Sequence, residues 1–190
     1  MSLFYIKNFF RDKNIGSITP TSQVAVKTVC KNIDFSKAKA VVEFGPGGGV
    51  FTNYILSKLP QDAKLIAFEL NPVFAQHLRD EITDKRFHLF EESAELIAER
   101  LKSEGISEID AVISGIPFSF FDIPLKKRIV ANILSVMKKN GRITLYQFFP
   151  PPSKKGERMS TVFKEEVGNS NVRLELRNIP PLIIYETVKP

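Results

Sequence analysis

Short apolar runs alternate with amphipathic stretches along most of the chain. Each apolar run is rich in β-branched or aromatic residues and is bounded by turn residues, which is typical of strands. The predicted strands are Ala40–Phe44, Lys64–Glu69, Phe87–Phe90, Ile109–Ser114, Arg142–Phe148, Val172–Asn178 and Leu182–Val188. The stretches between them predict helices over about Thr21–Lys31, Val50–Leu59, Pro72–Ile82, Ala94–Ser103, Pro124–Lys138 and Glu157–Val167. Strands that alternate with helices indicate an α/β fold with a mainly parallel sheet.

Two local patterns refine this topology. In the stretch after Pro124 the apolar residues follow helical spacing, and Asn140-Gly141 is predicted to stop the helix. The last two strands are separated by only Ile179-Pro180-Pro181, which is too short for a crossover helix. We therefore expect these two strands to pair antiparallel. We see no internal repeat and no linker, so residues 1–190 are predicted to form one domain.

Composition excludes several classes of protein. With 43% hydrophobic and 25% charged residues the chain is globular. No apolar run approaches the roughly 18–20 residues of a membrane span, and the N-terminus lacks the pattern of a signal peptide, so a cytoplasmic location is expected. The single cysteine, Cys30, rules out a disulfide framework and a cysteine-based zinc cluster, and no metal site is predicted.

The formal charge of +6 is unevenly distributed. Residues 1–60 carry a net charge of +5, residues 61–110 carry −6 and residues 111–190 carry +7. The first residues, up to Arg11, also interleave Phe, Tyr and Ile with basic side chains. Such a segment either packs its aromatics on the domain or lies on a membrane surface with its cations outward. The two basic ends point to an anionic partner, which charge alone does not identify.

The sharpest motif is the glycine-rich turn Gly45-Pro46-Gly47-Gly48-Gly49, which joins a buried strand to the start of a helix. Glycines permit a close approach of ligand to backbone, and a helix N-terminus offers free N–H groups. Glu69 ends the next strand, where a carboxylate can accept hydrogen bonds from ribose hydroxyls. A nicotinamide or flavin site would need glycine or alanine five positions after Gly45, but Val50 stands there.

Glu43, two residues before Gly45, and glycines at alternate positions 45, 47 and 49 resemble the loop of class I S-adenosylmethionine-dependent methyltransferases. The resemblance implies their Rossmann-like fold: a seven-stranded, mostly parallel sheet with an antiparallel C-terminal hairpin and helices on both faces. It also implies S-adenosylmethionine as the cofactor, with residues 1–35 covering it. By the same resemblance, the cofactor-binding residues are Ile18, Thr19, Glu43, Gly45, Pro46, Gly47, Gly49, Glu69, Leu70, Ser93, Ala94 and Ser114. Ser93 stands where these enzymes carry an acid beside the adenine, so Ser93 itself, Glu92 or Glu95 takes that role.

Two subfamilies share this layout. The ribosomal RNA adenine dimethyltransferases carry Asn-(Ile/Leu)-Pro-(Tyr/Phe) after the fourth strand, and their Asn accepts from the adenine amine. This chain has Gly115-Ile116-Pro117-Phe118 instead, so one acceptor for a planar amine is missing. It also lacks, after the seventh strand, the helical domain with which those enzymes hold RNA.

The bacterial phospholipid N-methyltransferases resemble the chain more closely. The similar segments are Ile-Gly-Ser-Ile-x-Pro-x-Ser at 15–22, Ser-Gly-Ile-Pro at 114–117, Gln-Phe at 147–148 and Arg-Asn-x-Pro-Pro at 177–181. The resemblance places Gly115, Pro117, Phe118 and Tyr146 at the catalytic site. Aromatic rings attract methylated ammonium groups, so Phe118 and Tyr146, and less strongly Phe120 and Phe121, are expected to wall the amine pocket. Tyr146 and water are both candidate bases, and the expected phosphate contacts are Lys126, Lys127, Arg128, Lys154 and Lys155.

Three functions therefore remain. The leading one is N-methylation of a phosphatidylethanolamine-like lipid by a protein peripheral to an anionic membrane surface. The alternative is N6-methylation of adenine in ribosomal RNA, and the third is a cofactor-binding module that has lost catalysis. The oligomeric state stays open.

Overall fold

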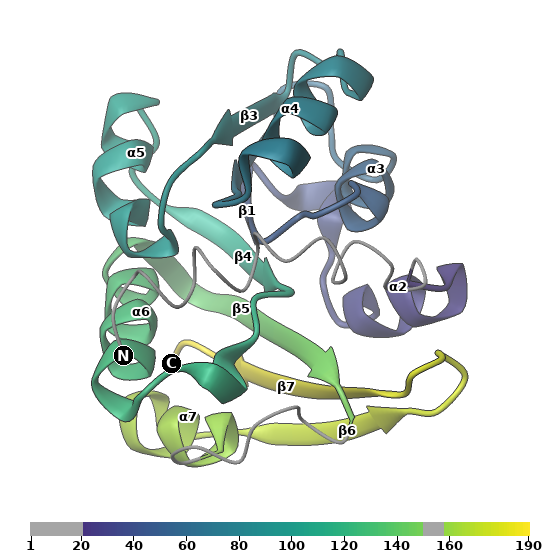
Figure 1. Ribbon diagram of the computed structural model, residues 1–190. Helices are drawn as coiled ribbons and strands as arrows, with labels where there is room; N and C mark the ends of the chain where they lie inside the picture. Colours follow the sequence, from purple (N-terminus) through teal and green to yellow (C-terminus); the bar gives the residue numbers. More distant parts are fainter. Residues whose placement is uncertain (1–20, 150–157) are drawn as a thin grey trace.

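A computed structural model describes residues 21–149 and 158–190. Within this part of the chain seven strands form one sheet in the order β3-β2-β1-β4-β5-β7-β6 (Figure 1). Their bounds are β1 Ala40–Phe44, β2 Lys64–Phe68, β3 Phe87–Phe90, β4 Ile109–Ser114, β5 Met137–Phe148, β6 Asn171–Glu175 and β7 Leu182–Val188. Strands β1 to β5 pair in parallel, whereas β7 pairs antiparallel with both β5 and β6. The predicted class I topology, including the antiparallel C-terminal pair, is confirmed.

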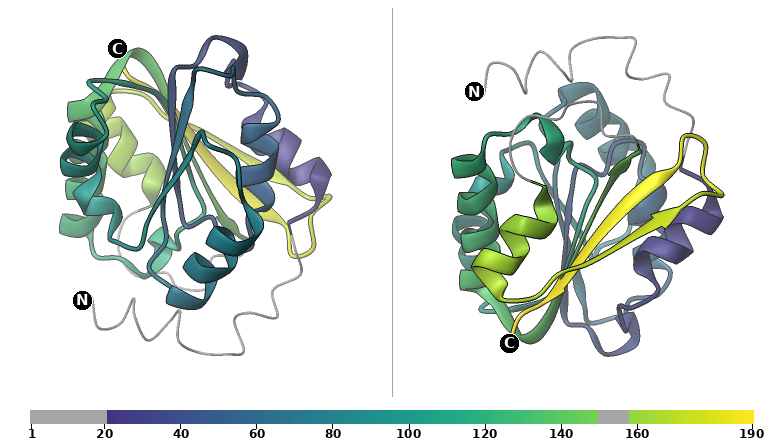
Figure 2. Two further views of the ribbon diagram at one scale, coloured as in Figure 1. Left: turned by 90° about the horizontal axis from the view of Figure 1, so that it is seen from above. Right: turned by 90° about the horizontal axis from the view of Figure 1, so that it is seen from below.

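Helices cover both faces of the sheet, as Figure 2 shows from above and below. One face carries α5 and α6 with α7, and the other carries α2, α3 and α4 (Figure 1). The bounds are α2 Gln23–Cys30, α3 Val50–Leu56, α4 Pro72–Glu81, α5 Ile97–Ser103, α6 Ile123–Val136 and α7 Met159–Val167. Short 3-10 turns lie at Phe35–Lys37, Ala94–Leu96 and Phe118–Phe120.

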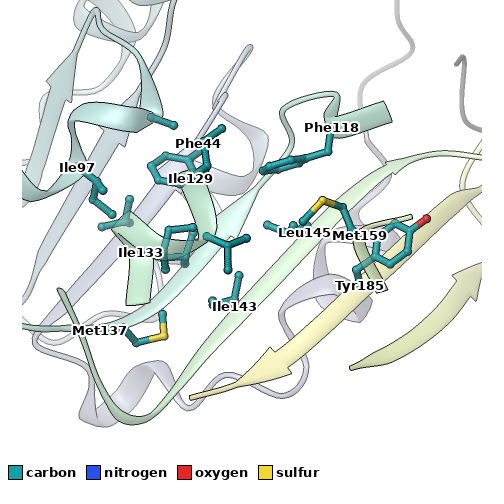
Figure 3. Close-up of a cluster of buried hydrophobic side chains, with 14 of the residues drawn as sticks. Phe44, Ile97, Phe118, Ile129, Ile133, Met137, Ile143, Leu145, Met159 and Tyr185 are labelled. Carbon is teal, nitrogen blue, oxygen red and sulfur yellow. The ribbon is translucent and has the colours of Figure 1, made fainter. Parts of the chain in front are cut away.

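Alternating side chains of the central strands divide the core into two clusters. Val42 and Phe44 of β1 face α5, α6 and α7, whereas Val41 faces α2 and α3. Figure 3 shows the first cluster, in which Phe44 lies near Ile129 of α6 and Tyr185 of β7 packs at the far end. Strands buried on both faces explain why the central runs are almost wholly apolar.

The helix predicted over Val50–Leu59 ends at Leu56, and two further predicted helix bounds are wrong. Helix α6 ends at Val136 and not at Asn140-Gly141, because Met137 already pairs with Ile109 of β4. Asn140, at φ 62°, instead turns the backbone within β5. The helix predicted over Ala94–Ser103 is a 3-10 turn followed by the shorter α5. In both places hydrogen bonding in the fold overrides helix periodicity.

The strand order reverses at β1: the chain first adds β2 and β3 on one side of β1, and then returns to add β4 on the other side. In open parallel sheets the crevice beside such a reversal, at the carboxyl ends of the strands, is where ligands bind. We call this side of the molecule the carboxyl edge. No helix within residues 21–149 and 158–190 combines the length and hydrophobicity needed to cross a bilayer.

Candidate functional site

The glycine loop leaves β1 at the carboxyl edge and leads directly into α3. Gly45, Gly47 and Gly49 have φ of 69°, 54° and 78°, a region that other residues rarely adopt. A Cβ on Gly45 would lie 2.9 Å from Ile116 Cγ2, so glycine there lets the loop after β4 approach. A Cβ on Gly47 or Gly48 would meet nothing within 4 Å. The loop is therefore tight on its β4 side and open at its centre, and the Gly49 N–H closes it by donating to the Pro46 carbonyl.

Glu69 follows β2 and is almost completely buried beside this loop. Its Oε2 accepts from the Gly47 N–H at 3.0 Å, and its Oε1 accepts from the Asn71 N–H at 2.9 Å. Burial raises the pKa of Glu69, and the hydrogen bonds from Asn71 and Gly47 oppose the rise. Glu69 thus fixes the middle of the glycine loop and also lines the neighbouring pocket.

Glu43, on β1, is a fully buried acid with a free oxygen. Its Oε2 accepts from the Thr52 hydroxyl of α3 at 2.8 Å, while Oε1 has no partner among the described residues. Burial raises the pKa of Glu43 to about 8, which outweighs the opposing hydrogen bond from Thr52. An unpaired carboxylate oxygen buried next to a ligand loop is suited to a cationic group of the ligand.

Glu43→Gln is expected to stabilise the cofactor-free protein at high pH. Because the folded pKa is about 8 and the ordinary value is 4.5, the cost of ionising Glu43 grows between these pH values and is complete above pH 8. The variant should unfold like the wild type near pH 4.5. Above pH 8 it should gain on the order of a few kcal/mol in free energy of unfolding, measured by urea denaturation.

Glu175→Gln is the matched control for this prediction. Arg177 beside Glu175 lowers the pKa of that acid to about 2, so the ionised form of Glu175 stabilises the fold. Its contribution is present above the ordinary pKa and is lost as the pH falls toward 2, the opposite direction to Glu43. A Glu43→Gln variant that is no more stable than wild type at pH 9 contradicts the burial argument.

A pocket opens beside the loop between β2, the turn after β3 and the start of α6. Of the predicted cofactor-binding residues, its lining includes Gly45, Glu69, Leu70, Ser93 and Ala94. Ser93 Oγ accepts from the Glu95 N–H at 3.3 Å and so begins the 3-10 turn that shapes one wall. Both acids considered as substitutes for Ser93 also line the pocket and are paired with arginines, Glu92 with Arg100 and Glu95 with Arg128.

Of the apolar wall of this pocket, only Phe121 was predicted as a wall residue, and it was assigned to the amine pocket. The wall consists of side chains from β2, the β4 loop and the α6 region, namely Phe68, Ile116, Phe121, Leu125 and Ile129. In the sequence, the spacing of Leu125 and Ile129 indicates only the apolar face of a helix. Nothing in that pattern separates a pocket wall from ordinary core.

On the other side of the loop, Gly115 and Tyr146 are in direct contact. Gly115 follows β4 and Tyr146 lies on β5, the adjacent strand. A Cβ on Gly115 would lie 2.5 Å from Tyr146 Oη and 2.8 Å from Cζ, so any other residue at 115 requires this ring to move. The ring also stacks on Phe51 of α3, with centroids 4.4 Å apart and planes at 22°. Tyr146 is therefore held between the helix after the glycine loop and the loop after β4.

The other predicted catalytic residues lie nearby with different surroundings. Pro117 precedes the 3-10 turn that contains Phe118. Phe118 is 2% exposed, packs on Phe121 and belongs to the hydrophobic core in Figure 3, and it is not among the pocket-lining residues. Ser114 is buried at the end of β4, where its Oγ accepts from the Ile116 N–H at 3.4 Å.

The expected phosphate contacts on α6 are already engaged in the fold. Lys126 is 2% exposed, Lys127 pairs with Glu165 at 2.8 Å and Arg128 pairs with Glu95 at 3.2 Å. This cluster is not a free basic patch. Ile18, Thr19, Lys154 and Lys155, and the aromatic-basic segment before Arg11, lie outside the described residues.

The residues present fit S-adenosylmethionine. The open space over Gly47 and Gly48 admits a ligand next to the backbone, and the free oxygen of Glu43 suits an ammonium group. The pocket beside Glu69 has apolar walls and a carboxylate at its edge, as a nucleoside requires. Among the described residues no cluster of His, Cys, Asp and Glu is arranged to hold a metal ion.

Comparison with known proteins agrees with this geometry. No protein-family model matches the chain. The chain is 29% identical over 184 residues to an ornithine lipid N-methyltransferase from Singulisphaera acidiphila, covering 96% of this chain and 93% of the relative. A precorrin-6y C5,15-methyltransferase from Geobacter metallireducens superposes with a TM-score of 0.70 at 15% identity, over 94% of this chain and 96% of the other. An O-methyltransferase of a Brevibacillus brevis polyketide multienzyme, solved with S-adenosyl-L-homocysteine, superposes with a TM-score of 0.52 at 20% identity, over 64% and 39%.

Fold, site and comparisons define the chain as an S-adenosylmethionine-dependent methyltransferase of class I. Within that class it resembles the lipid N-methyltransferases. The predicted class, activity and cofactor are thereby confirmed.

Proposed function

We propose that the protein N-methylates the amine head group of a membrane lipid, such as phosphatidylethanolamine or an ornithine lipid. The observation that carries the proposal is the contact between Gly115 and Tyr146. The tyrosine hydroxyl occupies the space into which a side chain at position 115 would project. An Asn that accepts hydrogen bonds from an adenine amine therefore has no room there, whereas a slender alkyl amine needs no such acceptor.

When bound, S-adenosylmethionine supplies an electrophilic methyl group. A primary alkyl amine is a competent nucleophile once it is neutral, so the protein's task is to orient it and to help it lose a proton. The ring of Tyr146 offers an aromatic wall, which favours ammonium groups that gain methyls. Phe51 fixes that wall by stacking on it.

Tyr146 acts as a neutral phenol in this proposal. Burial, together with the nearby Glu43, raises the pKa of Tyr146 well above its usual value. A phenolate base is therefore disfavoured near neutral pH, and of the two candidate bases water is the better. The hydroxyl serves as a hydrogen-bonding group that positions the amine.

The relative supports the same class of acceptor. It is named an ornithine lipid N-methyltransferase, and phosphatidylethanolamine is likewise a lipid that carries an amine. The match extends over 96% of this chain and 93% of the relative, so it is not confined to the cofactor loop.

The test is to incubate the protein with radiolabelled S-adenosylmethionine and one of four acceptors. Label is expected in vesicles of phosphatidylethanolamine or of ornithine lipid. Vesicles of phosphatidylcholine are the matched control, because their quaternary nitrogen accepts no methyl. Ribosomal RNA is the fourth acceptor, and label found only there overturns the proposal in favour of an adenine methyltransferase.

A further inference from the structure

Exposed apolar side chains gather at the carboxyl edge. The large hydrophobic residues exposed within the described chain are Val24, Val73, Phe149, Val172, Leu174, Leu176 and Ile179. Phe149 follows β5 and Leu176 follows β6 at this edge, whereas Val73, the second residue of α4, lies at the same edge beside β2, near the other end of the sheet. Scattered exposed hydrophobics are ordinary, but a set at one edge indicates a contact surface.

The turn between β6 and β7 contributes the most exposed members of this set. Leu176 is 68% exposed and Ile179 is 79% exposed. In Figure 1 the turn projects at the end of the molecule next to α2. An apolar side chain in water has a free-energy cost that a polar side chain does not have. The exposure of Leu176 and Ile179 therefore indicates that another surface covers them.

This turn is anchored to its neighbours. The buried Asn178 accepts from the Ser22 N–H at 2.9 Å and donates to the Pro180 carbonyl at 2.7 Å. The Phe149 N–H donates to the Pro181 carbonyl at 2.8 Å, which ties the turn to the end of β5. The apolar side chains are thus presented outward by a turn with fixed hydrogen bonds.

The turn and the amine site lie at the same edge of the sheet. Tyr146 pairs with Ile184 on β7, and two residues further along β5 Phe148 pairs with Leu182, the first residue after the turn region. A lipid amine that reaches Tyr146 keeps its acyl chains in the bilayer. The carboxyl edge must therefore face that bilayer, and this step rests on the proposed function.

Charge at this edge suits the same partner. Lys27 is exposed on α2 one turn after Val24, and Arg158 is exposed at the start of α7; Arg177 in the turn itself is exposed but paired with Glu175 at 2.7 Å. Apolar side chains that enter a membrane surface with cations around them are typical of peripheral binding.

We infer that the β6–β7 turn is a membrane-docking element that inserts Leu176 and Ile179 into the lipid surface beside the amine site. The test compares the double variant Leu176→Gln/Ile179→Gln with wild type in sedimentation with phosphatidylcholine vesicles. The partition coefficient is expected to fall about tenfold or more, and 0.5 M salt should not abolish wild-type binding to these neutral vesicles.

The matched control is Val172→Gln/Leu174→Gln, which changes two exposed apolar residues of the same β6 strand before the turn. Its vesicle binding is expected to stay within about twofold of wild type. Equal losses in the two double variants, or no loss in Leu176→Gln/Ile179→Gln, overturn the inference. Light scattering that shows a wild-type dimer and a monomeric turn variant also overturns it, because the turn then serves self-association.

Measurements of methyltransferase activity distinguish a failure of this inference from a failure of the proposed function. On phosphatidylethanolamine vesicles the turn variant should lose activity with its binding. On a short-chain phosphatidylethanolamine dispersed below its micelle concentration, it should match wild type. If wild type methylates neither form, the proposed function fails, and the docking inference is still decided by sedimentation on phosphatidylcholine.

Discussion

Replacing Gly115 with Ala is expected to lower kcat/KM for a lipid amine by about 100-fold, because a displacement of about 1 Å at a reacting centre has an effect of this size. The new Cβ would lie 2.5 Å from Tyr146 Oη, a distance at which one group must move. Gly115 does not have a positive φ, so alanine adds no backbone strain of its own. The tyrosine, which stacks on Phe51, is then expected to leave the position in which it walls the proposed amine site.

Gly48→Ala is the fold control for this variant. Gly48 also lacks a positive φ, and a Cβ there meets nothing within 4 Å, so its unfolding temperature should equal that of wild type. Gly115→Ala should be somewhat less stable by the same measurement, yet folded at the assay temperature. Full lipid methylation by Gly115→Ala would show that Tyr146 is not part of the amine site.

The contact between Gly115 and Tyr146 also determines which variant can test the alternative function, methylation of adenine in ribosomal RNA. Gly115→Asn alone would displace Tyr146, so it cannot restore the carboxamide acceptor of the RNA enzymes in its proper place. The double variant Gly115→Asn/Tyr146→Ala provides the room. If that variant methylates ribosomal RNA and wild type methylates neither RNA nor lipid, the RNA-enzyme ancestry is favoured.

Glu69→Gln is expected to weaken the binding of S-adenosylmethionine about 100-fold. Both carboxylate oxygens accept from backbone, Oε2 from the Gly47 N–H and Oε1 from the Asn71 N–H. A glutamine has one accepting oxygen, so its NH₂ would face one of these N–H donors. Glutamine would also be a weaker acceptor for the ribose hydroxyls that Glu69 is expected to bind, and a hydrogen bond to a charged group contributes about 1.5–3 kcal/mol, or roughly ten- to 150-fold in affinity. Isothermal titration calorimetry measures the change.

Asp110→Asn is the matched control at the opposite edge of the sheet. Asp110 Oδ2 also accepts from two backbone groups, the Lys39 N–H at 2.7 Å and the Ala40 N–H at 2.9 Å, but these lie at the start of β1. The control should lose stability and keep its affinity for S-adenosylmethionine. Equal loss of affinity in both variants would mean that Glu69 acts through general stability and not through the glycine loop.

Strand positions were predictable because the central strands are buried on both faces and need continuous apolar runs. The ends of the helices were less predictable from the sequence. The end of α6 depends on the pairing of Met137 with Ile109, which is 28 residues away in the chain. The burial of Phe118 and Lys126 was likewise not predictable from the sequence, because helical spacing does not indicate which neighbours cover a side chain.

The amino-acid sequence by itself determined the glycine loop, the acid after the second strand and the alternation of strands and helices. These follow from local rules: glycine permits positive φ, and strands and helices differ in their periodicity. The contact of Gly115 with Tyr146 was decided only when β5 was placed beside β4. The strand order likewise brought the apolar turn after β6 to the edge that holds the amine site, because long-range pairing sets which chain segments share an edge. The sequence thus determined the cofactor chemistry, whereas the tertiary structure decided the shape of the acceptor site and the surface that surrounds it.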